Sequence, residues 1–127
     1  MGLLHSLLTK LGLSEDKIER DPIRVFLLDD DKRRHQWFLE RFKDDLIDVA
    51  DNVESALQLL STNSYDAIFL DHDLHPEHYH SDEKDDTRTG YAIALWLATN
   101  PKLQRASTIV VHTRNADGAM RMVEELR

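Results

Sequence analysis

The sequence predicts an α/β protein built on an open parallel sheet with helices on both faces. One observation behind this prediction is a set of short, nearly continuous apolar runs, typical of strands buried on both faces of a parallel sheet. Another is their alternation with segments of helical periodicity, the pattern of successive βα units. The chain has 127 residues and is 41% hydrophobic, which suits one compact domain. We therefore expect a single domain over residues 1–127 with about four strands.

The N-terminal residues 1–20 are predicted to form an accessory helical segment outside the sheet. Leucines recur at helical spacing on one face of residues 1–13, MGLLHSLLTKLGL. This stretch has no basic start and no long apolar run, so it differs from a targeting sequence. We expect its helix to pack on the domain or on a partner, for instance as a dimer contact. Attachment to a membrane surface is the alternative that we do not favour.

The α/β core is predicted over residues 23–127, and each of its elements has a local signal. Apolar runs predict strands, apolar residues spaced three to four apart predict helices, and Asn, Asp and Pro mark boundaries. In chain order we expect a strand at 23–28, a helix at 31–43, a strand at 46–50, a helix at 53–63 capped by Asp51 or Asn52, a strand at 65–71, a polar loop at 75–88, a helix at 90–99, a strand at 108–113 and a helix at 116–126. Trp37 and Trp96 fall among apolar residues at helical spacing and are predicted to lie in the core.

Composition narrows the classes of function. Lys and Arg number 16 against 24 Asp and Glu, giving a formal net charge of −8. This balance argues against broad DNA or RNA binding, which needs excess positive charge, but leaves room for a small phosphorylated ligand. The chain has no cysteine, so disulfides and thiolate metal sites are impossible, and we expect a cytoplasmic protein.

Acidic and imidazole side chains follow three of the predicted strands, at the sheet edge where open parallel sheets bind ligands. These residues are Asp29, Asp30 and Asp31 after the first strand, Asp71, His72 and Asp73 after the third, and His112, Thr113, Arg114 and Asn115 after the fourth. Clustered carboxylates repel one another unless a cation lies between them, and Mg²⁺ or Mn²⁺ accepts carboxylates together with phosphates. Asp29, Asp30 and Asp71 are therefore the predicted ligands of a divalent metal, and solvated strand ends are the alternative.

Basic residues and further histidines flank this edge. Arg114 and Asn115 precede a helix N-terminus, a favourable place for an anion, so both are predicted to bind phosphate. Lys32, Arg33 and Arg34 lie either in a solvated first helical turn, which we favour, or against a phosphate. The loop histidines, His75, His78 and His80 with Glu77, could form a second, transition-metal site, belong to a lid, or be solvated.

The stretches LLDDD, YDAIFLD, TG before a helix and IVVHT resemble the receiver domain of two-component response regulators, over about residues 23–127. The resemblance implies a flavodoxin-like sheet with strand order 2-1-3-4, Mg²⁺ bound by Asp29, Asp30 and Asp71, a phosphoacceptor at Asp71 and a phosphoryl-sensing hydroxyl at Thr113. The chain departs from receivers because the fifth βα unit, with its lysine, is missing. The connection between Asp71 and Gly90 is also longer than in receivers.

The stretches LDHDL and HTRNADGAMRMV are similar to a divergent receiver-like family proposed to process cyclic phosphates. This resemblance implies a phosphoesterase site with catalytic residues Asp71, His72, Asp73 and His112. Two histidines can supply the base and acid that open a cyclic phosphate, and a carboxylate-bound metal can offset charge or activate water. Convergence requires the strand to end or bend at His72, since extended backbone would point His72 away from Asp71 and Asp73.

Three functions therefore compete. The first is a metal-dependent phosphoesterase acting on cyclic phosphate, such as a 2′,3′-cyclic end of RNA or of a nucleotide. The second is an atypical receiver phosphorylated on Asp71 by a histidine kinase, which the missing lysine counts against. The third is a non-catalytic receiver-like module that binds a partner protein.

Overall fold

The computed structural model describes residues 20–74, 87–104 and 108–127, and these form a four-stranded parallel sheet. The strand order β2-β1-β3-β4 confirms the predicted order 2-1-3-4. The strands are β1 (Arg24–Leu28), β2 (Leu46–Ala50), β3 (Ala67–Leu70) and β4 (Thr108–Val111), and the helices are α2 (Lys32–Arg41), α3 (Val53–Thr62), α5 (Gly90–Thr99) and α6 (Ala116–Leu126). Every predicted core strand and helix is present, with ends that differ by no more than two residues.

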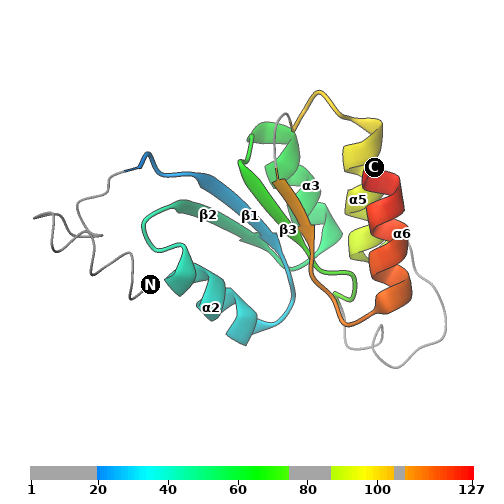
Figure 1. Ribbon diagram of the computed structural model, residues 1–127, viewed down its shortest axis with the longest axis horizontal. Coiled ribbons are helices and arrows are strands. Elements are labelled where there is room, and N and C mark those ends of the chain that lie inside the picture. Colours follow the sequence, from blue (N-terminus) through cyan, green and yellow to red (C-terminus); the bar gives the residue numbers. More distant parts are fainter. Residues whose placement is uncertain (1–19, 75–86, 105–107) are drawn as a thin grey trace, which may run out of the picture.

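The helices cover the two faces of the sheet unequally. Figure 1 shows α2 on one face, while α3, α5 and α6 gather on the other, where α5 packs along α6. Successive residues of a strand point to opposite faces. Phe26 and Leu28 of β1 therefore join the main core beneath α3, α5 and α6, whereas Phe69 of β3 meets Phe38 of α2, with ring centroids 5.0 Å apart.

The main core fills the space between the sheet and the three helices on its more heavily covered face. Its largest fully buried members are Phe26, Leu28, Leu60, Ile68, Leu70, Leu74, Ile93 and Met122. Burying each such side chain is worth about 1.5–3 kcal/mol relative to leaving it in water, which fixes the sheet against these helices. The face beneath α2 is smaller and largely aromatic, with Phe38 stacked on Phe42 at 6.1 Å.

Every described helix has an N-cap residue whose side chain bonds to the first helical turn. The caps are Asp31 for α2, Asn52 for α3, Thr89 for α5 and Asn115 for α6. Each side-chain oxygen accepts a hydrogen bond from a backbone N–H in the first helical turn, which would otherwise have no partner. Of the two candidates for the α3 cap, Asn52 holds the position.

The structure corrects one core prediction and leaves others outside its range. Trp37 is 60% exposed, so its predicted core position is wrong. The reason is that α2 buries only a narrow stripe containing His35 and Phe38. Trp96 packs against the main core as predicted. The predicted N-terminal helix and the loop histidines lie outside the described residues. Among the residues described, no helix is both long and apolar enough to cross a membrane.

The backbone at the end of β3 touches the start of α5 at Gly90. The amide of Gly90 donates to the carbonyl of His72 at 2.8 Å. A Cβ atom at Gly90 would lie 1.8 Å from the backbone oxygen of Asp71. Only glycine permits this approach, so Gly90 sets how closely α5 packs against the end of β3.

We predict that Gly90→Ala lowers the free energy of unfolding by at least about 2 kcal/mol, because the added methyl group must displace backbone. Urea unfolding followed by circular dichroism measures the change. Gly118→Ala is a comparison of a different kind, because the nearest atoms to its Cβ would belong to the His72 ring, at 2.5 Å, rather than to the backbone. Equal stability of Gly90→Ala and the wild type would contradict the close backbone contact between the end of β3 and the start of α5.

Candidate functional site

At the carboxyl edge of the sheet, the backbone hydrogen bonds between strands continue one residue past the strand ends. The amide of Asp71 donates to the Leu28 carbonyl at 3.0 Å, and the amide of His112 donates to the Leu70 carbonyl at 2.9 Å. Leu28 and Leu70 are register partners, so the next residues, Asp29 and Asp71, lie side by side with His112 beyond them. Pleat alternation points these three side chains toward the α2 face.

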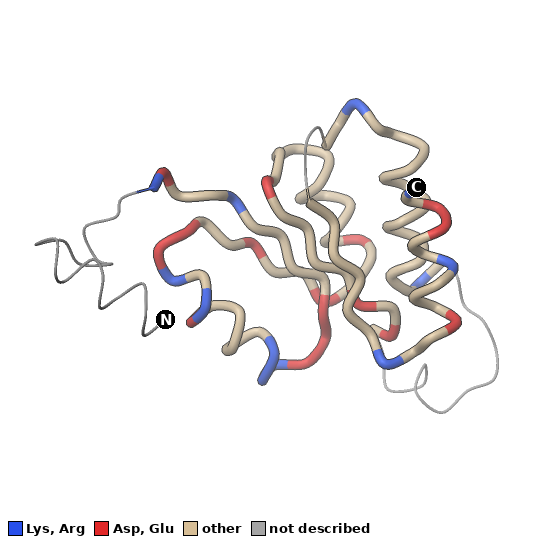
Figure 2. The backbone as a smooth tube through the Cα atoms, in the orientation of Figure 1, with Lys and Arg blue, Asp and Glu red and all other residues tan. Residues whose placement is uncertain are grey.

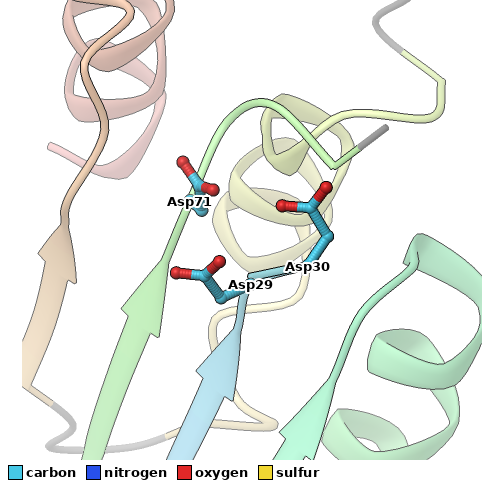
Figure 3. A group of neighbouring side chains, drawn as sticks. All are labelled: Asp29, Asp30 and Asp71. Carbon is cyan, nitrogen blue, oxygen red and sulfur yellow. The ribbon is translucent and has the colours of Figure 1, made fainter. Parts of the chain in front are cut away.

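Three carboxylates converge at this edge, as the sequence predicted. Asp29 and Asp30 at the end of β1 and Asp71 at the end of β3 offer oxygen atoms that all lie within 4.8 Å of one another (Figure 3). Asp29 has no exposed surface, and Asp71 is 4% exposed. Hard oxygen donors at this spacing fit Mg²⁺ or Mn²⁺, which take carboxylates, water and phosphate oxygens as ligands.

Arg34 of α2 is bound to two of these carboxylates, those of Asp29 and Asp71, and the sequence analysis missed these contacts. Its Nε and Nη2 donate to the two oxygens of Asp29 at 2.6 and 2.9 Å, and Nη2 also lies 3.3 Å from Asp71 Oδ2. One signal was available, because helical side chains lean toward the helix N-terminus. An arginine in the first turn after an acidic strand end therefore points back at those acids.

Burial governs the protonation of Asp71. Loss of solvent, followed by the charge of Asp29, raises the pKa of Asp71 to about 7. Arg34 and hydrogen bonds from the Thr113 hydroxyl and the His72 amide act in the opposite direction. The carboxylate is therefore poised to lose its proton near neutral pH, where a cation favours the charged form.

His112 lies beside the carboxylates in a partly aromatic setting. Its Nδ1 is 3.9 Å from Asp29 Oδ2, and its ring centroid is 5.7 Å from that of Phe38 and 6.3 Å from that of Phe69. Burial lowers the pKa of the imidazole, so His112 is neutral at physiological pH. Within the described chain, its buried Nε2 has no hydrogen-bond partner.

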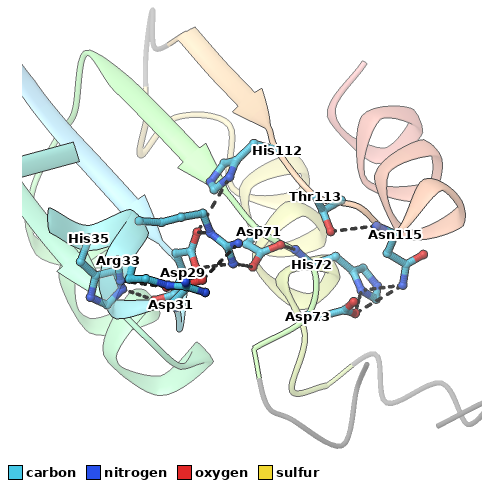
Figure 4. A network of polar contacts seen from close by, with 11 residues as sticks. Asp29, Asp31, Arg33, His35, Asp71, His72, Asp73, His112, Thr113 and Asn115 are labelled. Carbon is cyan, nitrogen blue, oxygen red and sulfur yellow. Dashed lines mark hydrogen bonds and ion pairs between the residues drawn. The ribbon is translucent and has the colours of Figure 1, made fainter. Parts of the chain in front are cut away.

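His72 does not converge with His112. β3 ends at Leu70 and the backbone bends at His72, but the His72 ring lies on the opposite face of the sheet from His112, against Gly118 of α6. There Nδ1 of His72 is 2.7 Å from Asp73 Oδ1, and the Asn115 amide lies 3.3 Å from both. Figure 4 shows the two histidines on either side of Asp71. The structure therefore does not bring the two predicted catalytic imidazoles together.

A pocket of about 750 Å³ opens over the cluster. It is lined by Asp30, Asp31, Arg33, Arg34, Asp71, Asp73, His112, Thr113 and Arg114. Figure 2 shows the matching charge pattern, with acidic residues at the end of β1 followed directly by basic residues at the start of α2. Of the predicted phosphate-binding residues, Thr113 and Arg114 lie in this wall. The side chain of Asn115 instead caps α6, accepting from the Gly118 amide at 2.9 Å.

Comparisons with known proteins agree with this architecture. A family model described as the cyclic-phosphate-processing receiver domain matches residues 23–127. The chain has no match among curated proteins.

Solved structures of similar fold are response-regulator receivers. One is a response regulator from Burkholderia pseudomallei with a phosphorylated aspartic acid, a calcium ion and citrate, at 18% identity and a TM-score of 0.61, covering 83% of this chain and 55% of that one. Another, the signal receiver domain of a protein described as a LuxO repressor from Vibrio parahaemolyticus, has 19% identity and a TM-score of 0.58, with coverage of 83% and 73%. A third, TrrA from Thermotoga maritima with Mg²⁺ and BeF, has 20% identity and a TM-score of 0.51, with coverage of 83% and 99%.

We predict that Asp71→Asn stabilises the metal-free protein increasingly as pH rises. The pKa of Asp71 is higher in the folded than in the unfolded chain, so its stabilising contribution is present at low pH and lost as pH rises through about 7. Asparagine has no such loss. The gain in unfolding free energy should therefore grow to about 2 kcal/mol between about pH 5 and about pH 8, measured by urea unfolding.

His112 is common to both proteins, so its own pH dependence, which runs the other way because its pKa is lowered, cancels in the difference. Excess Mg²⁺ should raise the melting temperature of the wild type at about pH 8 but not that of Asp71→Asn. A stability difference that stays constant with pH would contradict the raised pKa of Asp71.

Proposed function

Because this chain belongs to the family of cyclic-phosphate-processing receiver domains, we propose that its pocket hydrolyses a cyclic phosphate ester with the help of a divalent cation. The observation that supports this most is that a neutral imidazole, His112, shares one pocket with three converging carboxylates. The resemblance to receivers implies an apolar or small residue at this position, so His112 adds proton-transfer capacity to an acidic receiver pocket.

Asp29, Asp30 and Asp71 are the residues that would hold the cation, Mg²⁺ or Mn²⁺. When bound there, the cation would offset the negative charge of the phosphate and so favour attack by water. The basic residues of the pocket wall, Arg33 and Arg114, face the remaining phosphate charge, and the Thr113 hydroxyl offers a hydrogen bond.

His112 acts on the proton of the attacking water. As the water oxygen forms a bond to phosphorus, the neutral imidazole accepts one of its protons. The ring P–O bond breaks, and the departing ester oxygen takes that proton back from the imidazolium. The products are a phosphomonoester and a free hydroxyl, and His112 returns to its neutral form. One histidine serves both steps, which suits a pocket that His72 does not line.

Asp73 and His72 have a positioning role in this scheme. Asp73 contributes to the pocket wall, and its Oδ1 is held by His72 and by the Asn115 amide. These contacts connect the wall of the pocket to the first turn of α6 and fix the direction of the Asp73 carboxylate.

A second candidate function is transfer of a phosphoryl group to Asp71 from a histidine kinase. The observation that favours it is the pairing of the Asp71 carboxylate with the Thr113 hydroxyl inside the pocket. A response regulator of similar fold carries a phosphorylated aspartic acid. Among the described residues that line the pocket there is no lysine, the residue with which receivers contact the phosphoryl group.

We predict that the full chain with Mg²⁺ or Mn²⁺ opens a 2′,3′-cyclic nucleotide or RNA end, and that His112→Gln slows this by at least about 100-fold. Phosphorus NMR resolves the product and shows which oxygen leaves. His72→Gln is the matched control, with an expected loss below about tenfold, because that ring lies outside the pocket. Equal losses in the two variants would restore a mechanism with two catalytic histidines.

Incubation with acetyl phosphate and Mg²⁺ tests the second function. If Asp71 is a phosphoacceptor, intact-mass spectrometry detects one added phosphoryl group in the wild type and none in Asp71→Asn. Labelling without ring opening would favour signalling over hydrolysis. Absence of both activities would favour a non-catalytic module that binds a partner protein.

A further inference from the structure

We infer that Arg34 is an internal counter-cation of the acidic cluster, and that a divalent cation binds only by displacing it. Arg34 therefore sets the metal affinity of the pocket. This inference rests on the proposed cation site, and it concerns a residue whose role the receiver resemblance does not supply.

The contacts of Arg34 occupy the oxygens that a cation would need. Its guanidinium forms a two-pronged pair with Asp29, at 2.6 and 2.9 Å, and further contacts with Asp71 at 3.3 Å and with Asp31 at 3.5 Å. Asp29 Oδ1 also accepts from the Asp31 amide at 2.9 Å, and Asp29 is wholly buried. Asp29 and Asp71 are thus bound to an arginine at the point where the carboxylates converge.

A guanidinium and a divalent ion cannot share this space. Both are cations, and in a buried setting their repulsion is weakly screened. Two-pronged arginine–carboxylate pairs are also among the stronger charge-assisted contacts, so breaking this one opposes metal binding. The side chain of Arg34 is 40% exposed and extends from the first turn of α2, so it can swing away while the helix stays in place.

Displacement gives Arg34 a second position in the same pocket. The pocket wall already holds Arg33 and Arg114, so a released Arg34 adds positive charge where a phosphate would lie. Metal binding then favours anion binding, and by linkage the anion favours the metal to the same degree. An arginine that only stabilises the fold would stay on Asp29 when metal enters.

Arg33 provides a matched comparison for Arg34. It is the preceding residue, carries the same charge and also lines the pocket. Its side chain is 95% exposed, and its charged contact is with Asp31 at 3.8 Å rather than with the cluster. Arg33→Gln and Arg34→Gln therefore change net charge equally, but only Arg34→Gln frees the carboxylates.

The first experiment is calorimetric titration of the full chain with MgCl₂ at about pH 8, where protons compete least with the metal. Arg34→Gln should bind Mg²⁺ about tenfold more tightly than the wild type, and Arg33→Gln should stay within about twofold. Arg34→Lys, which keeps the charge but lacks the two-pronged geometry, should fall between them. Unchanged or weaker binding by Arg34→Gln would overturn the inference.

A second measurement uses the wild type alone and stands even if Arg34→Gln does not fold. The side-chain Nε–H of Arg34 donates to Asp29, so it should give a protected signal in nitrogen-edited NMR spectra. Mg²⁺ should shift or remove this signal with the dissociation constant found by calorimetry. A signal unchanged at saturation overturns the displacement model alone. Absence of Mg²⁺ binding in every variant overturns the proposed cation site as well.

Discussion

The register of the parallel ladder is the constraint on which the pocket depends. Because β3 is paired with β1 on one side and β4 on the other, the residues that follow each strand continue in one row. That row carries Asp29, Asp71 and His112 on the same face. A slip of one residue in any strand would send its member of the row to the opposite face. The hydrophobic pairing of the strands therefore fixes the chemistry at their ends.

Burial of the side chains at this edge explains why Asp71 and His112 differ from the same side chains in water. Burial alone makes a charged Asp71 costly, and it also keeps His112 neutral. The two effects act in the same direction on charge, because both favour the neutral form, but in opposite directions on proton binding: one retains a proton on an acid and the other keeps a proton off a base. A dry edge of the sheet thus yields a proton acceptor beside carboxylates that attract a cation.

The sequence was sufficient for the fold and for part of the site. Mainly apolar segments predicted every described strand, although Asp48 interrupts β2. The acids after β1 and β3 predicted the carboxylate cluster, because parallel strands end at one edge. The orientation of His72 depends on the backbone path after β3, which bends at His72 and which the residue types do not determine. Trp37 looked like a core residue because helical spacing alone does not show how narrow the buried stripe of α2 is.

Arg34 has a consequence for how the protein is made. Many metal sites are assembled only when the ion arrives, and their domains stay unfolded without it. Here a side chain from α2 already offsets the buried charge of Asp29. The chain carries its own substitute for the ion, so the sheet edge can form during synthesis whatever the supply of metal. At the proposed cation site, folding of the chain and binding of the ion would therefore be separate events.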